Sequence, residues 1–78
     1  MPRFFFNLRD DVSVEDGEGK ELPDAASARA EAVRHARDIM SEDIKEGRLM
    51  LNDSIDIVDE QGRPVATLRF REAIEIDE

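Results

Sequence analysis

The chain has 78 residues, no cysteine, one histidine and a formal net charge of −9. This length predicts a single domain over residues 1–78, and the lack of cysteine excludes disulfides and thiolate metal sites. An acidic chain repels nucleic acid and anionic membranes, and no apolar run approaches the roughly 20 residues of a membrane span. Neither nucleic acid nor a membrane is therefore an expected partner. No targeting segment is recognisable, so the expected location is cytoplasmic.

Residues 3–8 predict the first strand, because their side chains alternate in character with a period of two. One side collects Phe4, Phe6 and Leu8, and the other collects Arg3, Phe5 and Asn7. The three consecutive phenylalanines thus span both sides of the strand. At least one ring is expected to face away from the layer that covers the other two.

A turn is predicted at Asp10 and Asp11, since aspartate tolerates turn conformations. Residues 12–14 then form a short return strand. Residues 15–19 are acidic and contain two glycines, which predicts a loop, and residues 20–22 extend the strand pairing.

Residues 25–46 carry the helical period, with Asp24 as N-cap and Gly47 as the C-terminal glycine. The apolar stripe is formed by Ala25, Ala28, Ala32, Ala36, Ile39 and Met40, and it is widened by Val33 and Ile44. The opposite, solvated face is expected to hold Ser27, Glu31, Arg34, Asp38, Ser41, Glu42 and Lys45. This pattern is typical of one amphipathic helix that packs on a sheet.

Two further strands are predicted at residues 54–59 and 64–70, joined by a hairpin turn in which Gly62 takes a positive φ. Residues 74–76 alternate again and predict a short fifth strand or an extended wrap. The element order β-β-α-β-β indicates an α+β, two-layer domain. One amphipathic helix packs on a mainly antiparallel sheet of about four strands.

No catalytic constellation is present, so the chain is not expected to be an enzyme or to hold a cofactor or metal. Gly17-Glu18-Gly19 matches neither glycine-rich phosphate loop, and its acidic neighbours would repel phosphate. The carboxylates of residues 15–21 are oxygen ligands suited to calcium, but no EF-hand spacing fits them. His35 lies four residues after Glu31, so the two side chains can meet on the helix, and His35 is expected to be a half-exposed surface residue.

The side of the sheet turned away from the helix is the candidate interaction surface. On the assumption that the first and last strands are neighbours, it comprises Arg3, Phe5, Arg9, Val65, Thr67, Arg69 and Arg71. Aromatic and arginine side chains are enriched at protein interfaces.

Three interpretations of this surface remain open. In the first, Asp56 and other carboxylates pair with the arginines across the strands, and the surface is solvated. In the second, the surface binds a second copy of the chain or another protein, which predicts a non-enzymatic interaction module and a homodimer. In the third, single-stranded nucleic acid stacks on Phe5 while arginines hold its phosphates. The net charge of −9 disfavours this accessory nucleic-acid-binding role.

Several stretches occur in an order that carries a family resemblance. They are residues 1–6 (MPRFFF) with the turn at Arg9-Asp10, residues 21–24 (ELPD) leading to Ala28, Glu31 and Ala32, residues 59–63 (DEQGR), and residues 70–76 (FREAIEI). Together they resemble a bacterial family of short proteins of unknown function. The resemblance covers nearly the whole chain and implies a bacterial, cytoplasmic, stand-alone protein, but that family has no established activity and transfers no functional residue.

Overall fold

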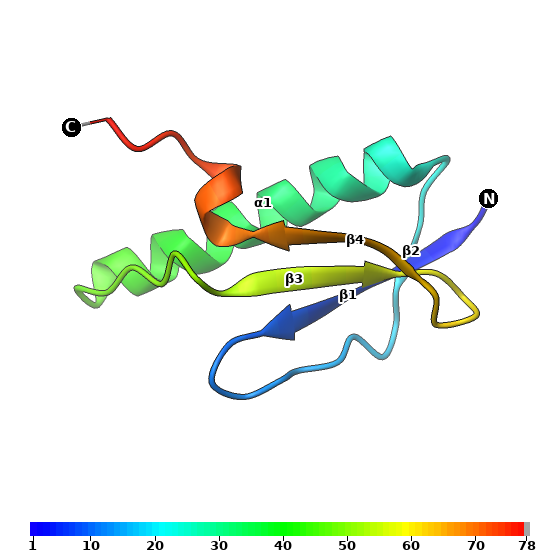
Figure 1. The fold of residues 1–78 in the computed structure, drawn as a ribbon, viewed down its shortest axis with the longest axis horizontal. Helices are drawn as coiled ribbons and strands as arrows, with labels where there is room; N and C mark the ends of the chain where they lie inside the picture. The colour runs from blue at the N-terminus through cyan, green and yellow to red at the C-terminus, as the bar shows by residue number, and fades with distance from the viewer. Residues whose placement is uncertain (78) are drawn as a thin grey trace.

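In the computed structural model, which describes residues 1–77, one helix packs on one face of a four-stranded antiparallel sheet (Figure 1). The elements are β1 (Arg3–Arg9), β2 (Lys20–Glu21), α1 (Ala25–Lys45), β3 (Ser54–Val58), β4 (Pro64–Arg69) and the 3-10 helix η1 (Phe70–Ala73). The predicted α+β fold with two layers is confirmed.

The sheet has the strand order β2-β1-β3-β4, and all three pairings are antiparallel. Strand β3 therefore lies between β1 and β4, and the assumption that the first and last strands are neighbours is wrong. A period of two determines which face of the sheet a side chain occupies, but it carries no information about which strand lies alongside.

The helix begins and ends where its capping residues predict. The Asp24 side chain accepts a hydrogen bond from the Ser27 amide at 2.8 Å, and Gly47 follows the C-cap with a φ of +84°. Ala28, Ala32 and Ala36 are fully buried, so the helix approaches the sheet closely. Two residues expected in the apolar stripe are not buried. Ala25, at the start of the helix, is exposed, and Ile44, near its end, is 58% exposed.

The core lies between α1 and the inner face of the sheet. Phe4 and Phe6 from β1 are buried together with Ile55 and Ile57 from β3. Phe70, Ile57 and Leu68 are the largest fully buried side chains. Each such side chain stabilises the fold by about 1.5–3 kcal/mol relative to an exposed one. Phe70 belongs to η1, so its burial also holds the 3-10 helix against α1.

Two predicted strands take another form. Residues 12–14 contribute only a single bridge between Leu8 and Val14, and the side chains of Val12 and Val14 are exposed. Of the two alternatives predicted for residues 74–76, the fifth strand does not form: the chain leaves β4 through η1, and Ile74 then has extended backbone angles without pairing. The hairpin turn is confirmed, with Gly62 at a φ of +77°. Within residues 1–77, no helix has the length and apolar character to cross a membrane.

Candidate functional site

The outer face of the sheet is the face turned away from α1, and in residues 1–77 no helix or strand covers it (Figure 1). Pairing and alternation place on it Arg3, Phe5, Asn7 and Arg9 from β1, Ser54, Asp56 and Val58 from β3, and Thr67 and Arg69 from β4. Five of the predicted surface residues therefore share this face: Arg3, Phe5, Arg9, Thr67 and Arg69. The side chains of β3 separate those of β1 from those of β4.

The other two predicted surface residues, Val65 and Arg71, are placed differently. Val65 lies where the register of β3 and β4 shifts, and it is half-buried against the core. Arg71 lies in η1, beyond the end of β4, where its guanidinium donates to Asn52 Oδ1 at 2.8 Å. The strand predicted over residues 64–70 is one residue too long, because the Phe70 side chain packs in the core and Phe70 is the first residue of η1.

Among residues 1–77, Asp56 is the only carboxylate at the centre of the outer face, and it links the strands across that face. Its Oδ2 atom accepts from Arg9 Nε at 2.7 Å, and its Oδ1 atom accepts from the Thr67 hydroxyl at 3.0 Å. The predicted pairing of Asp56 with an arginine is thus confirmed. Because the pair is partly exposed, it contributes only about 0–1 kcal/mol to stability. The Arg69 side chain makes no ion pair among residues 1–77, although its main-chain amide and its charge both help to lower the pKa of the Glu72 carboxyl.

Phe5 is half-buried because the chain between β1 and β2 covers part of its ring. Gly19 has a φ of +68°, and a Cβ atom there would lie 2.8 Å from both Phe5 Cε2 and the carbonyl oxygen of Phe4. Because a Cβ atom at position 19 would clash, glycine is needed there for the segment between β1 and β2 to pack this closely on Phe5. The ring faces away from the helical layer, as predicted, but part of its contact area is already supplied by its own chain.

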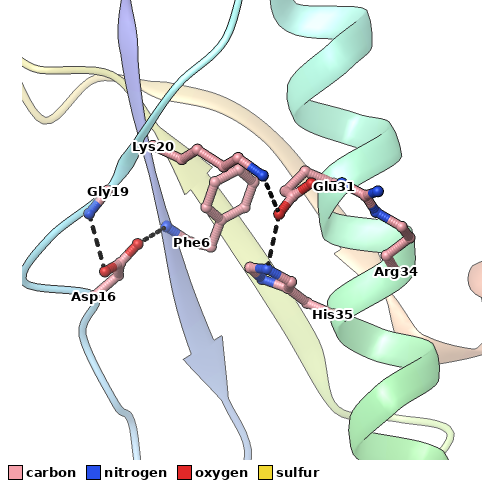
Figure 2. Close-up of polar contacts among 7 residues, drawn as sticks. All are labelled: Phe6, Asp16, Gly19, Lys20, Glu31, Arg34 and His35. Atoms are coloured by element: carbon pink, nitrogen blue, oxygen red, sulfur yellow. Dashed lines mark hydrogen bonds and ion pairs between the residues drawn. The ribbon is translucent and has the colours of Figure 1, made fainter.

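Asp16 holds this covering segment in place. Its carboxylate accepts from the main-chain amides of Phe6 at 3.2 Å and Gly19 at 3.1 Å (Figure 2). It also accepts from the Glu18 amide at 3.0 Å. In return, the Asp16 amide donates to Asn7 Oδ1 at 3.0 Å. Burial opposes ionisation of Asp16, but the amides of Gly19, Glu18 and Phe6 outweigh it and lower the pKa of the carboxyl below its ordinary value. The free edge of β1 is thereby closed by the chain's own loop.

Glu31 is the one buried charged residue of the described chain, and its burial corrects the prediction that it lies on the solvated helix face. Its side chain is only 8% exposed and forms ion pairs with Lys20 at 3.1 Å and with Arg34, and its Oε2 atom lies 3.2 Å from His35 Nε2 (Figure 2). Lys20 comes from β2, so this cluster ties the helix to the sheet edge. The helical period alone cannot reveal it, because the burial is created by a lysine eleven residues earlier in the chain.

His35 is half-exposed and pairs with Glu31, as predicted. Its ring also packs edge-on against Phe6, with a centroid distance of 5.2 Å and an interplanar angle of 67°. Beside it lies an apolar cavity of about 240 Å³, lined by Phe6, Leu8, His35, Asp38, Ile39 and Ile55. Glu31 is already occupied by cations, so it is not an available base for this cavity.

A second cavity of about 280 Å³ lies next to the first and shares Ile39 with it. Its rim carries four aspartates, Asp10, Asp11, Asp43 and Asp53. Burial raises the pKa of Asp53 above its ordinary value, and the charges of Asp10, Asp11 and Asp43 raise it further. The carboxylates of this rim therefore repel one another.

We expect Asp53→Asn to increase the free energy of unfolding at pH 7 by about 0.5 kcal/mol, because it removes one member of a repelling set. A raised folded-state pKa means that the penalty is fully present above that pKa and disappears as the pH falls below the unfolded value. Urea denaturation at pH 7 and at pH 3 measures the difference. Glu18→Gln removes one negative charge from an exposed site away from this rim and from the helix ends, and an equal gain from it would contradict the explanation.

Within the described residues, no three histidine or acidic side chains are arranged to hold a metal ion. The chain matches no curated protein and no solved structure. One protein family does match, over residues 3–71, and it carries the description "domain of unknown function". Since the match includes most of the sequence and every strand of the sheet, the chain belongs to the family DUF6894.

Proposed function

We propose that this domain is a non-enzymatic interaction module that binds a second copy of itself through the outer face of its sheet. The observation that carries the proposal is that Arg3, Arg9 and Arg69 share a face that no helix or strand of residues 1–77 covers. Asp56 pairs with Arg9 near the centre of this face, and Arg3 pairs with Glu21 at its margin. The whole chain has a net charge of −9, so this face differs in charge from the rest of the molecule.

Charge supports this choice of surface. Two molecules of −9 repel each other at long range, and contact is least opposed where the local charge is not negative. The outer face offers arginine side chains, which are enriched at interfaces and can donate to carboxylates or carbonyls of a partner. Phe5 and Val58 lie directly opposite each other in the β1–β3 register and add apolar area beside them.

The size of the domain supports a partner as well. A chain of 78 residues with one layer of helix buries a small core, and such domains commonly gain stability by association. A second copy on the outer face would add a third layer over Phe5 and Val58, whose side chains are only half-buried in the single chain.

The decisive variant is Ser54→Glu. Ser54 lies directly opposite Arg9 on one side and Arg69 on the other, so a glutamate there would pair with both arginines within the same chain. Opposite charges across strands contribute roughly 0.2–1 kcal/mol, so the folded state is expected to be as stable as the wild type or slightly more so. The arginines would no longer be available to a partner.

Light scattering at high protein concentration should give a mass near two chains for the wild type and near one chain for Ser54→Glu. Ser41→Glu, on the exposed side of the helix, makes the same chemical change and should leave the mass at two chains. A wild-type protein that stays monomeric, or a dimer that Ser54→Glu leaves intact, would remove the proposal.

A further inference from the structure

The two edges of the sheet differ in how many of their main-chain groups are hydrogen-bonded. On the β1 side, Phe4 pairs with Lys20, the Phe6 amide donates to Asp16, and Leu8 and Val14 exchange main-chain hydrogen bonds at 2.8 and 2.9 Å. This edge is closed along its length. On the other side, β4 is the last strand of the sheet. Exposed strand edges are sites where another chain can add a strand.

The hydrogen-bond pattern shows which groups of β4 are open. Residues of an antiparallel strand alternate between facing the paired strand and facing away from it. The Phe70 amide donates to the Asp53 carbonyl at 2.9 Å, so Phe70 and Leu68 face β3, and Arg69 and Thr67 face away. The Arg69 amide is already bound by Glu72 Oε1 at 2.9 Å. The N–H and C=O groups of Thr67 and the C=O group of Arg69 therefore lie along the open edge.

Residues 74–77 belong to no helix and pair with no strand among the described residues. Ile74 has a φ of −138° and a ψ of 160°, which are β-strand values, and its side chain is half-buried against the core, where it fixes the start of the segment. Ile76, two residues further on, is 55% exposed. The segment alternates isoleucine with Glu75 and Asp77, which is the pattern of a strand. Figure 1 shows it running away from the sheet after η1.

The charges of the edge and of the segment are complementary. Arg69 lies on β4 at the edge, and Arg71 follows it in η1. Arg29 approaches the same region from α1, where it forms an ion pair with Glu72 at 3.6 Å. The two charged side chains of the segment, Glu75 and Asp77, are both negative. Its four residues would span about 13 Å as a strand, enough to cover the open groups of Thr67 and Arg69.

We infer that residues 74–77 of a second copy of this chain add as a fifth strand to the β4 edge. The segment cannot easily serve its own edge, because η1 carries the chain away from β4 and onto the helix, where Arg37 Nε donates to the Ala73 carbonyl at 2.7 Å. If each copy donates residues 74–77 to the other, the β4 edge of both copies is paired. The inference rests on the proposed self-association but uses a different contact from the outer face.

The test is a double charge reversal, Glu75→Lys with Asp77→Lys, which replaces attraction at the arginine-rich edge with repulsion. Both residues are exposed, so folding should be unaffected. We expect the dissociation constant of the dimer to rise at least about tenfold, so that light scattering at equal concentration gives a mass closer to one chain. Glu15→Lys with Glu46→Lys changes the net charge equally at exposed sites away from this edge and should leave the dimer intact.

A second measurement reports the edge directly. Exchange of the Thr67 amide with solvent should be slow at high concentration and should accelerate at least about tenfold on dilution or in the double variant. A Thr67 amide that exchanges equally fast at all concentrations, or a dimer that survives the double variant, would overturn the inference. The two proposals fail separately, since Ser54→Glu acts on the outer face and leaves the β4 main chain and residues 74–77 unchanged.

Discussion

Gly19→Ala is expected to lower the free energy of unfolding by about 2–5 kcal/mol, the sum of a positive-φ penalty and overpacking. The new Cβ atom would lie 2.8 Å from the Phe4 carbonyl oxygen and from the Phe5 ring, and the ring can move more easily than the main chain. For a domain of this length the total stability is roughly 4–12 kcal/mol, so the loss is a large part of it. Urea denaturation followed by circular dichroism measures the change.

Gly62→Ala is the matched control for this effect. Gly62 has a similar φ of +77°, but no atom lies within 4 Å of the position its Cβ would take. Only the conformational penalty of about 1–2 kcal/mol should remain. If the two variants were equally destabilised, the close packing of the loop on Phe5 would not be a source of stability.

Asp16→Ala is expected to cost about 2–3 kcal/mol, because the amides of Phe6, Glu18 and Gly19 lose their acceptor at once. The variant should also free the edge of β1. Amide exchange of Phe6 and Gly19 is expected to accelerate well before global unfolding, which would identify the loss as local. Asp16→Asn retains one carbonyl oxygen as acceptor and should lose less. An Asp16→Ala protein with unchanged stability and unchanged exchange at Phe6 would contradict the role given to this side chain.

The same carboxylate makes stability depend on pH in a defined direction. The pKa of Asp16 is lowered in the folded protein from an ordinary value of 3.8. Its contribution is therefore fully present above the unfolded pKa of about 3.9 and is lost as the pH falls through the lower folded value. Urea titrations between pH 5 and pH 2 should show a steeper loss of stability for the wild type than for Asp16→Ala.

The element types follow from local patterns, as particular residues show. Alternation in β1 places Phe4 and Phe6 inward and Phe5 outward, and the structure agrees. The caps Asp24 and Gly47 mark the helix ends because their chemistry acts within one turn of the chain. The Asp59–Gly62 turn is equally local, so its geometry is encoded by the four residues that form it.

The errors concern contacts between residues distant in sequence. Glu31 was assigned to solvent because the helix alone gives it a polar side, and only Lys20 from β2 makes it a buried ion-pair residue. Alternation continued past Arg69 predicts Arg71 on the outer face, whereas Phe70 enters the core and the chain turns into η1. In both cases a long-range contact outweighs the local pattern.

Periodicity and capping chemistry in the sequence were enough to specify one helix, the main strands, and the inward or outward direction of most of their side chains. The tertiary structure decided that β3 separates β1 from β4, that Asp16 and Gly19 close one sheet edge, and that the β4 edge stays open. The physical reason is that a repeat along the chain encodes direction only, whereas strand order and loop contacts depend on which distant groups satisfy each other's hydrogen bonds.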